Sequence, residues 1–331
     1  MTNKMPAWDL SDYYTSIKDA KIAEDLESYR QGTEEFAKRY KGKLAELSAE
    51  EFLAAAKDIE HRSKIASRLG GFAYLNMVTQ MKNVEAVAFY QDIQEKLTDY
   101  CKPAIFFSLE FNALPDAKIN EWLQNKDVAF YKYWIKRMRK FKDYELSEPV
   151  EEILVEKSLT SSEAWVRLYE ETSSRLVYTV DGKEYNDAEL SKLMLDKNPQ
   201  TREKAGKELN RVLKENGHLM TFIYNMVMKD KAIEDEKRGF KTPVSSRNLS
   251  EDVSDEAVEV LAQTVKKHYK DISERFYKLK AKWLGVEKIA YWDRNAPLPF
   301  ADDTTYSWDE AVQIVLNAYK EFSPKLYNIA K

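Results

Sequence analysis

Apolar residues recur along most of the chain at intervals of three or four, which is the spacing of one face of an α-helix. The clearest stripe spans residues 258–283, and Gly285 follows it as a C-terminal stop. A second stripe spans residues 312–329; Pro324 predicts a kink within it, and its continuation almost to Lys331 suggests a truncated chain. The spacing predicts helices over 20–42, 49–80, 84–101, 115–125, 127–140, 148–173, 187–195, 199–236, 254–284 and 308–329.

Residues that cap helices stand before several of these stretches. Ser48–Glu51, Asn186–Glu189 and Ser307–Glu310 each place a short polar residue three positions before a glutamate, which is the pattern of a capping box. Pro115 and Pro199 stand where a first helical turn tolerates proline. These signals support the predicted helix starts.

Residues 175–185 depart from the helical pattern. Their β-branched and aromatic residues flank Asp181-Gly182, a favoured pair for a tight hairpin turn. A second short strand is plausible at 286–292. The predicted fold is therefore mostly α, a multi-helix bundle with one small β-hairpin at about 175–185.

Composition supports a helical protein and argues against several classes of function. Only 9 Gly and 9 Pro occur in 331 residues, too few for a fold rich in turns. The chain has 52 basic and 56 acidic residues, which gives a net charge of −4. Proteins that bind nucleic acid usually have an excess of basic residues, so we expect no nucleic-acid partner. One cysteine, Cys101, fits a reducing compartment. No signal peptide and no run of 18 apolar residues is seen, so we expect a cytoplasmic protein that does not cross a membrane.

Three segments, taken in order, resemble the oligoendopeptidase F family of zinc metallopeptidases. The first is 141–154, FKDYELSEPVEEIL. The second runs from Ala164-Trp165 through VDGKEY at 180–185 to NPQTREKA at 198–205. The third spans 229–298, from KDK and RGF to KAKWLG and YWDRNAPL.

The resemblance implies a division of the chain and a function. Residues 1–110 would form an N-terminal helical region, 111–190 a helical subdomain ending in the hairpin, and 191–331 the start of the peptidase domain. Members of the family are longer, and their catalytic half carries a helical His-Glu-x-x-His motif. Two histidines one turn apart grip one zinc ion, and the glutamate activates the metal-bound water.

This sequence lacks that motif. Its only histidines are His61, His218 and His268; none is followed by glutamate, and an apolar residue stands four positions after each. No catalytic and no metal-binding residue is therefore predicted. Zinc is expected in the complete family member and not in this chain.

Two pairs of a carboxylate and a histidine, Asp58 with His61 and Glu215 with His218, fall on single helical faces. Two-metal helical bundles use Glu-x-x-His pairs, but one pair here begins with aspartate. We interpret both pairs as solvated polar faces. His268 lies on an apolar stripe and is predicted to be a half-buried packing residue.

Residues 130–142 interleave basic and aromatic side chains, a pattern that can contact nucleic acid. At helical spacing, however, Tyr131, Trp134 and Met138 form one stripe, which is more typical of a core rimmed by lysine and arginine. We therefore predict that this stripe packs inside the protein.

The loop that begins at Tyr291 is the predicted functional segment. The candidates for the wall of a substrate cleft are Tyr291, Trp292, Asp293, Arg294 and Asn295. The alternative is a purely structural corner in which Asp293 and Arg294 pair locally.

Two hypotheses for the function follow. The chain is the N-terminal part of a zinc metalloendopeptidase that cleaves short peptides, inactive alone because the zinc site is missing. Its partners would be short peptides in the complete enzyme, and either a separate catalytic half or a second copy of itself. The alternative is a zinc-less helical protein that binds peptides or a partner.

Overall fold

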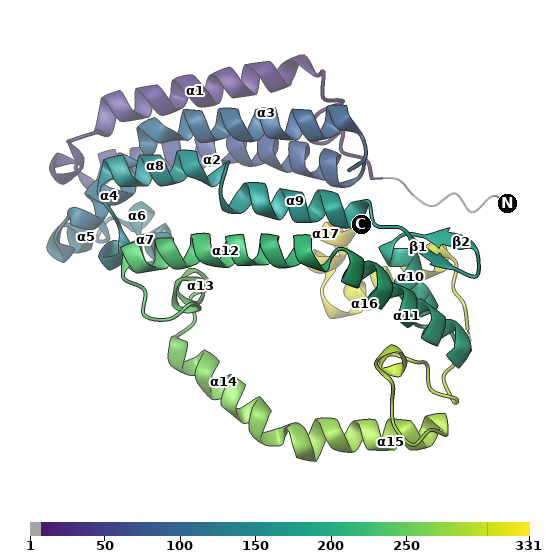
Figure 1. Ribbon diagram of the computed structural model, residues 1–331. Helices are drawn as coiled ribbons and strands as arrows, with labels where there is room; N and C mark the ends of the chain where they lie inside the picture. Colours follow the sequence, from purple (N-terminus) through teal and green to yellow (C-terminus); the bar gives the residue numbers. More distant parts are fainter. Residues whose placement is uncertain (1–7, 303) are drawn as a thin grey trace.

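The computed structural model describes residues 8–302 and 304–331, and it is mostly helical with one two-stranded hairpin (Figure 1). This confirms the predicted fold class; residues 1–7 of the predicted N-terminal region lie outside the described part. The elements are α1 Ala20–Tyr40, α2 Ala49–Val78, α3 Val84–Cys101, α4 Phe106–Ala113, α5 Asp116–Trp122, α6 Lys126–Phe130, α7 Lys132–Arg139, α8 Glu148–Ser158, α9 Ser162–Ser174, β1 Tyr178–Val180, β2 Lys183–Tyr185, α10 Asp187–Leu193, α11 Pro199–Glu215, α12 Gly217–Arg238, α13 Ser245–Ser250, α14 Asp255–His268, α15 Arg275–Leu284, α16 Trp308–Phe322 and α17 Pro324–Ala330.

The predicted caps begin the helices as expected. All three capping boxes form, at the starts of α2, α10 and α16. Pro199 is the first residue of α11, and the side chain of Asn198 accepts a hydrogen bond from the Gln200 N–H. These contacts satisfy N–H groups that a helix leaves free at its start.

The hairpin turns at Asp181-Gly182, as predicted. Asp181 has a φ of 52° and Gly182 a φ of 79°, and β1 pairs antiparallel with β2 so that Tyr178 lies opposite Tyr185. Positive φ at both central residues is the geometry that favours this residue pair. The strand proposed at 286–292 is wrong, because the described chain there is irregular and ends in a 3₁₀ turn at Tyr291–Asp293.

Several long predicted helices are divided in the structure. Stretches 127–140, 148–173 and 199–236 each form two helices, and the last is broken at Asn216. Pro324 ends the predicted final helix rather than kinking it, because proline starts α17 after an extended Ser323. The helix α4 was not predicted, because a segment of eight residues is too short to show a clear helical period.

The largest buried core joins α1 and α2 to the short helices α4–α7. At its centre the rings of Phe52 and Trp122 stack with centroids 4.2 Å apart, and the Trp122 indole N–H donates to the Leu47 carbonyl at 3.0 Å. Tyr131, Trp134 and Met138 pack against this cluster, which confirms the interpretation of that stripe as core.

The helices α14 and α15 form an arm on the opposite side of the molecule from α1 (Figure 1). A π-helical turn, Tyr269–Glu274, joins them. The apolar stripe predicted over 258–283 is largely uncovered: Leu261 is 64% exposed and Ile272 65%. His268 is exposed too, so its predicted half-buried packing role is wrong.

Candidate functional site

The loop that carries the predicted cleft residues is held against α11 by a buried ion pair. Arg202 donates from Nε to Asp293 Oδ1 at 2.8 Å, and both side chains are buried. Arg202 also donates to the carbonyl oxygens of Asp196 and Lys197, at 2.7 and 2.9 Å. The local pairing of Asp293 with Arg294 is therefore wrong, because the carboxylate turns toward α11 and its arginine.

Close packing at Gly206 brings the same loop onto α11. A Cβ atom at Gly206 would lie 2.8 Å from the Cβ of Trp292, nearer than side chains approach, so only glycine fits. The Tyr291 hydroxyl donates to the Gly206 carbonyl oxygen, and burial raises the pKa of Tyr291. The tyrosine is thus a structural anchor as well as a candidate cleft residue.

A lysine from α15 fixes the other side of the loop. Lys280 is buried and donates from Nζ to the carbonyl oxygen of Arg294 at 2.7 Å. Burial lowers the pKa of Lys280, the nearby cation of Arg202 lowers it further, and Asp293 raises it. Two cations and one carboxylate therefore share this buried corner.

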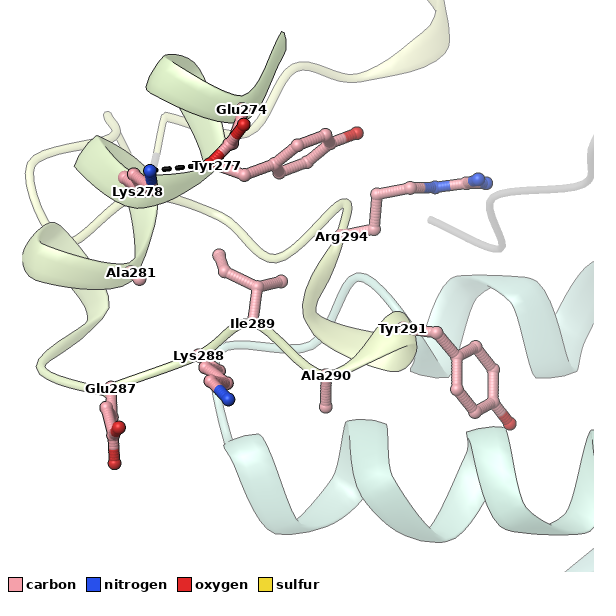
Figure 2. A pocket seen from close by; sticks show the side chains of 10 residues that line it. All are labelled: Glu274, Tyr277, Lys278, Ala281, Glu287, Lys288, Ile289, Ala290, Tyr291 and Arg294. Atoms are coloured by element: carbon pink, nitrogen blue, oxygen red, sulfur yellow. Dashed lines mark ion pairs between the residues drawn. The ribbon is translucent and has the colours of Figure 1, made fainter. Parts of the chain in front are cut away.

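A cavity of about 470 Å³ opens between this loop and α15 (Figure 2). Figure 2 shows Ile289 pointing toward α15, whereas Tyr291 points to the other side, against α11. Glu274 and Lys278 form an ion pair of 2.5 Å on the α15 side. The exposed lining is mainly apolar, with charged groups among the residues that surround it.

The five predicted cleft residues lie in different environments. Tyr291 and Arg294 line the cavity. Trp292 is half-buried, Asp293 is buried in the ion pair, and Asn295 is exposed without lining the cavity. The cavity can bind an apolar group beside charges, and its described lining contains no serine, threonine, cysteine or histidine.

Sequence reasoning missed the partners of this loop, namely Arg202, Gly206 and Lys280. Each stands in a predicted helix, Arg202 and Gly206 about 85 to 90 positions before the loop. Arg202 and Lys280 lie in the segments that resemble the oligoendopeptidase F family, and this position could have marked them as candidates. A glycine in mid-helix is the other signal, since it often marks close packing.

The histidines do not assemble a zinc site. His61, His218 and His268 are all exposed, and residues 8–302 and 304–331 contain no group of three or more His, Cys, Asp or Glu side chains placed to hold a metal ion. Glu215 pairs with Arg211 rather than with His218. The residues present therefore do not fit a zinc ion.

These features define a helical scaffold with a cavity beside a tightly anchored loop. A protein-family model described as Oligopeptidase F matches residues 110–178. The resemblance to the oligoendopeptidase F family is thereby confirmed in this N-terminal region. No curated protein sequence matches the chain.

Solved structures of peptidases share the fold. The oligoendopeptidase F of Enterococcus faecium superimposes with a TM-score of 0.77 at 16% identity, over 92% of this chain and 62% of that one. The putative oligoendopeptidase F of Bacillus anthracis gives 0.69 at 19% identity, over 98% of this chain and 57% of that one. PZ peptidase A with an inhibitor gives 0.68 at 17% identity, over 97% and 54%. The chain thus spans about three fifths or less of each structure.

No helix in the described part of the chain has the length and apolar character needed to cross a membrane.

Proposed function

We propose that this chain is the non-catalytic, N-terminal part of an oligoendopeptidase F-like zinc metalloendopeptidase that cleaves short peptides in the cytoplasm. The observation that carries the proposal is the fold, which matches 92 to 98% of this chain to oligoendopeptidase F structures, combined with a sequence that contains no His-Glu-x-x-His motif. Alone, the chain is inactive, because the groups that bind zinc and activate water belong to another part of the enzyme.

The uncovered apolar faces of α14, α15 and α16 support a partner that packs against them. Phe276 is 46% exposed and Phe322 84%. Such faces tend to bind another protein surface, because apolar side chains are more stable away from water. The occupant we propose is the catalytic half, and without it the chain associates with itself.

The loop at 291–295 would then stand at the border of the substrate cleft. Tyr291 and Arg294 already line a cavity there, and Asp293 holds the loop in place through Arg202. The boundaries 1–110, 111–190 and 191–331 belong to the same proposal. A second candidate, a zinc-less peptide-binding protein, is favoured by this cavity, which is formed by the chain itself.

A binding experiment tests the proposal. The purified chain is mixed with a separately expressed half that carries His-Glu-x-x-His, from an oligoendopeptidase F of the same organism, and complex formation is followed by sedimentation velocity. Phe276→Glu should weaken the complex, whereas Gln263→Glu, an exposed change on α14, should not. A chain that remains a monomer at all concentrations and ignores the catalytic half would favour the peptide-binding protein.

A further inference from the structure

Residues 126–143 concentrate positive charge in a chain whose net charge is −4. They include seven lysine and arginine residues against two aspartates. Arg139 is used inside the protein, because its guanidinium donates to three carbonyl oxygens at the end of α4. The other six cations are exposed: Lys126, Lys132, Lys136, Arg137, Lys140 and Lys142. This segment is therefore basic although the protein as a whole is acidic.

Most of the exposed cations lack an acidic partner. Arg137 donates to the carbonyl oxygen of Ser250 at 2.7 Å, and Lys140 pairs with Asp252. Within the described part of the chain, the other four form no ion pair: Lys126, Lys132, Lys136 and Lys142. Their positive charge is thus left for a partner outside the chain.

The spacing of these lysines differs from that on other helices of this protein. Elsewhere a lysine commonly pairs with a carboxylate one helical turn away, as Lys64 does with Glu60 at 2.7 Å. On α7, by contrast, Lys132, Lys136 and Lys140 follow one another at intervals of four. Like charges at this spacing repel one another and destabilise a helix slightly. An anionic partner would remove this repulsion.

Two aromatic rings stand among the charges. Phe130 is 81% exposed and Tyr133 86%. They cannot turn into the core, because Ile135 occupies the inner face of α7. The ring of Tyr131 meets that of Phe130 edge-on at 5.2 Å, and its hydroxyl is held by Glu60 at 2.8 Å. We call the two exposed rings and the six exposed cations the basic–aromatic face.

This face lies at one end of the molecule. Helices α4 to α7 gather there, and the hairpin of β1 and β2 lies at the other end (Figure 1). The loop at 291–295 packs against α11, and so belongs to a different part of the fold. A helix at the end of the molecule can approach a broad surface without obstruction.

The chemistry of the face favours an anionic lipid bilayer over other anionic partners. Lysine and arginine are attracted to anionic headgroups, and aromatic rings beside them enter the boundary between headgroups and acyl chains. A single-stranded nucleic acid needs a basic groove in which its bases stack, whereas these rings protrude from a helix. An acidic peptide would match the charges but leave the rings in water.

We propose that the chain binds the surface of anionic membranes through the basic–aromatic face. Phe130 and Tyr133 enter the headgroup layer, and the lysines lie against phosphate and carboxylate groups of the lipids. The contact is peripheral and needs no membrane-spanning helix. It uses neither the cavity beside 291–295 nor the apolar faces of α14–α16, and so goes beyond the proposed function.

Vesicle flotation of the full chain tests this proposal. Phosphatidylcholine vesicles that contain about 30% phosphatidylserine are compared with vesicles of phosphatidylcholine alone. We expect the chain to float only with the anionic vesicles, and to be released in about 0.5 M salt, which screens the attraction. Flotation is preferable to sedimentation, because self-associated protein does not float without lipid.

Charge and aromatic variants locate the contact. Each lysine near an anionic bilayer contributes about a fivefold change in binding, so Lys132→Gln combined with Lys136→Gln should bind about thirtyfold more weakly. Phe130→Ser combined with Tyr133→Ser should bind several-fold more weakly at unchanged net charge. All four side chains are exposed, so thermal unfolding should be unchanged.

The matched control removes two exposed lysines near the hairpin. Lys192→Gln on α10 combined with Lys214→Gln on α11 changes the net charge by the same amount. This variant should float like the unmodified chain. An equal loss in both lysine variants would show that only net charge matters, and would overturn the proposal.

Three other results would also overturn it. The first is equal flotation with neutral and anionic vesicles. The second is flotation that no change in the basic–aromatic face affects, which would assign the contact to the apolar faces of α14–α16. The third is lysine-dependent binding of oligouridylate or polyglutamate that is tighter than binding to vesicles. Each leaves the association with a catalytic half to its own test.

Discussion

Removing the charge of Asp293 should release the loop at 286–296 from α11. Asp293→Asn keeps the size of the side chain but leaves Arg202, which is 4% exposed, without its carboxylate. Breaking a buried ion pair on one side costs about 3 to 5 kcal/mol. Arg202 keeps two carbonyl acceptors, so we expect the lower end, about 3 kcal/mol.

The matched control changes another aspartate that pairs with α11. Asp181 accepts from Lys204 at 2.7 Å, but these side chains are 69% and 54% exposed. An exposed pair contributes at most about 1 kcal/mol, and asparagine tolerates the positive φ at this turn. Asp181→Asn should therefore change the stability very little.

Hydrogen exchange measured by mass spectrometry reports the loss of stability in the loop at 286–296 itself. The Ala296 N–H donates to the Asp293 carbonyl oxygen at 3.0 Å and should be protected in the unmodified chain. A loss of about 3 kcal/mol corresponds to about a hundredfold faster exchange over 286–296. Combining Arg202→Met with Asp293→Leu should restore much of the protection. If Asp293→Asn exchanges no faster than Asp181→Asn, the ion pair does not hold the loop.

Three further predictions concern the hairpin and the metal. Glu208 accepts from the Thr179 N–H at 2.7 Å, and Arg211 lowers its pKa to about 2, against an ordinary 4.5. Because the pKa of Glu208 is lowered in the folded state, its carboxylate stabilises the docked hairpin above about pH 4.5, and this stabilisation is lost as the pH falls toward 2. In an NMR titration, Arg211→Gln should raise the pKa of Glu208. Gly182 has a φ of 79°, a conformation that strains valine, so Gly182→Val should destabilise the hairpin by roughly 1 kcal/mol or more. Urea unfolding measures this loss, and Gly217→Ala, a change at the start of a helix, should not destabilise the protein. Metal analysis after dialysis should find far less than one zinc ion per chain, and about one tightly bound ion would contradict the account.

The local rules of the sequence predicted the elements better than their packing. Capping boxes and the Asp181-Gly182 turn are contacts between near neighbours, so their residues can be recognised in a short window. The break at Tyr131 is harder to predict, because neither proline nor glycine stands there; the Tyr131 hydroxyl instead donates to Glu60 of α2. The helix α4 was missed because it is only eight residues long, and its apolar residues Phe106, Phe107 and Phe111 are buried by segments distant in the sequence.

The candidate site also depends on contacts between residues that are distant in the sequence, which could not be predicted. The segment 291–295 was predicted as a cleft wall from its residue types and stays a prediction, although two of its members line a cavity. Its organisation was not predictable, because Arg202 and Gly206 reach it from another helix far away in the sequence. His268 was misjudged for a related reason: an apolar stripe predicts a buried face only when something covers it, and the described residues leave this one exposed.

Peptide cleavage tests the central claim most directly. A quenched fluorescent peptide is incubated with the chain alone, with the catalytic half alone, and with both, each with and without a chelator of zinc. The account predicts background cleavage by the chain alone and chelator-sensitive cleavage that rises when both halves are mixed. Full-rate cleavage by the chain alone that survives the chelator would contradict it.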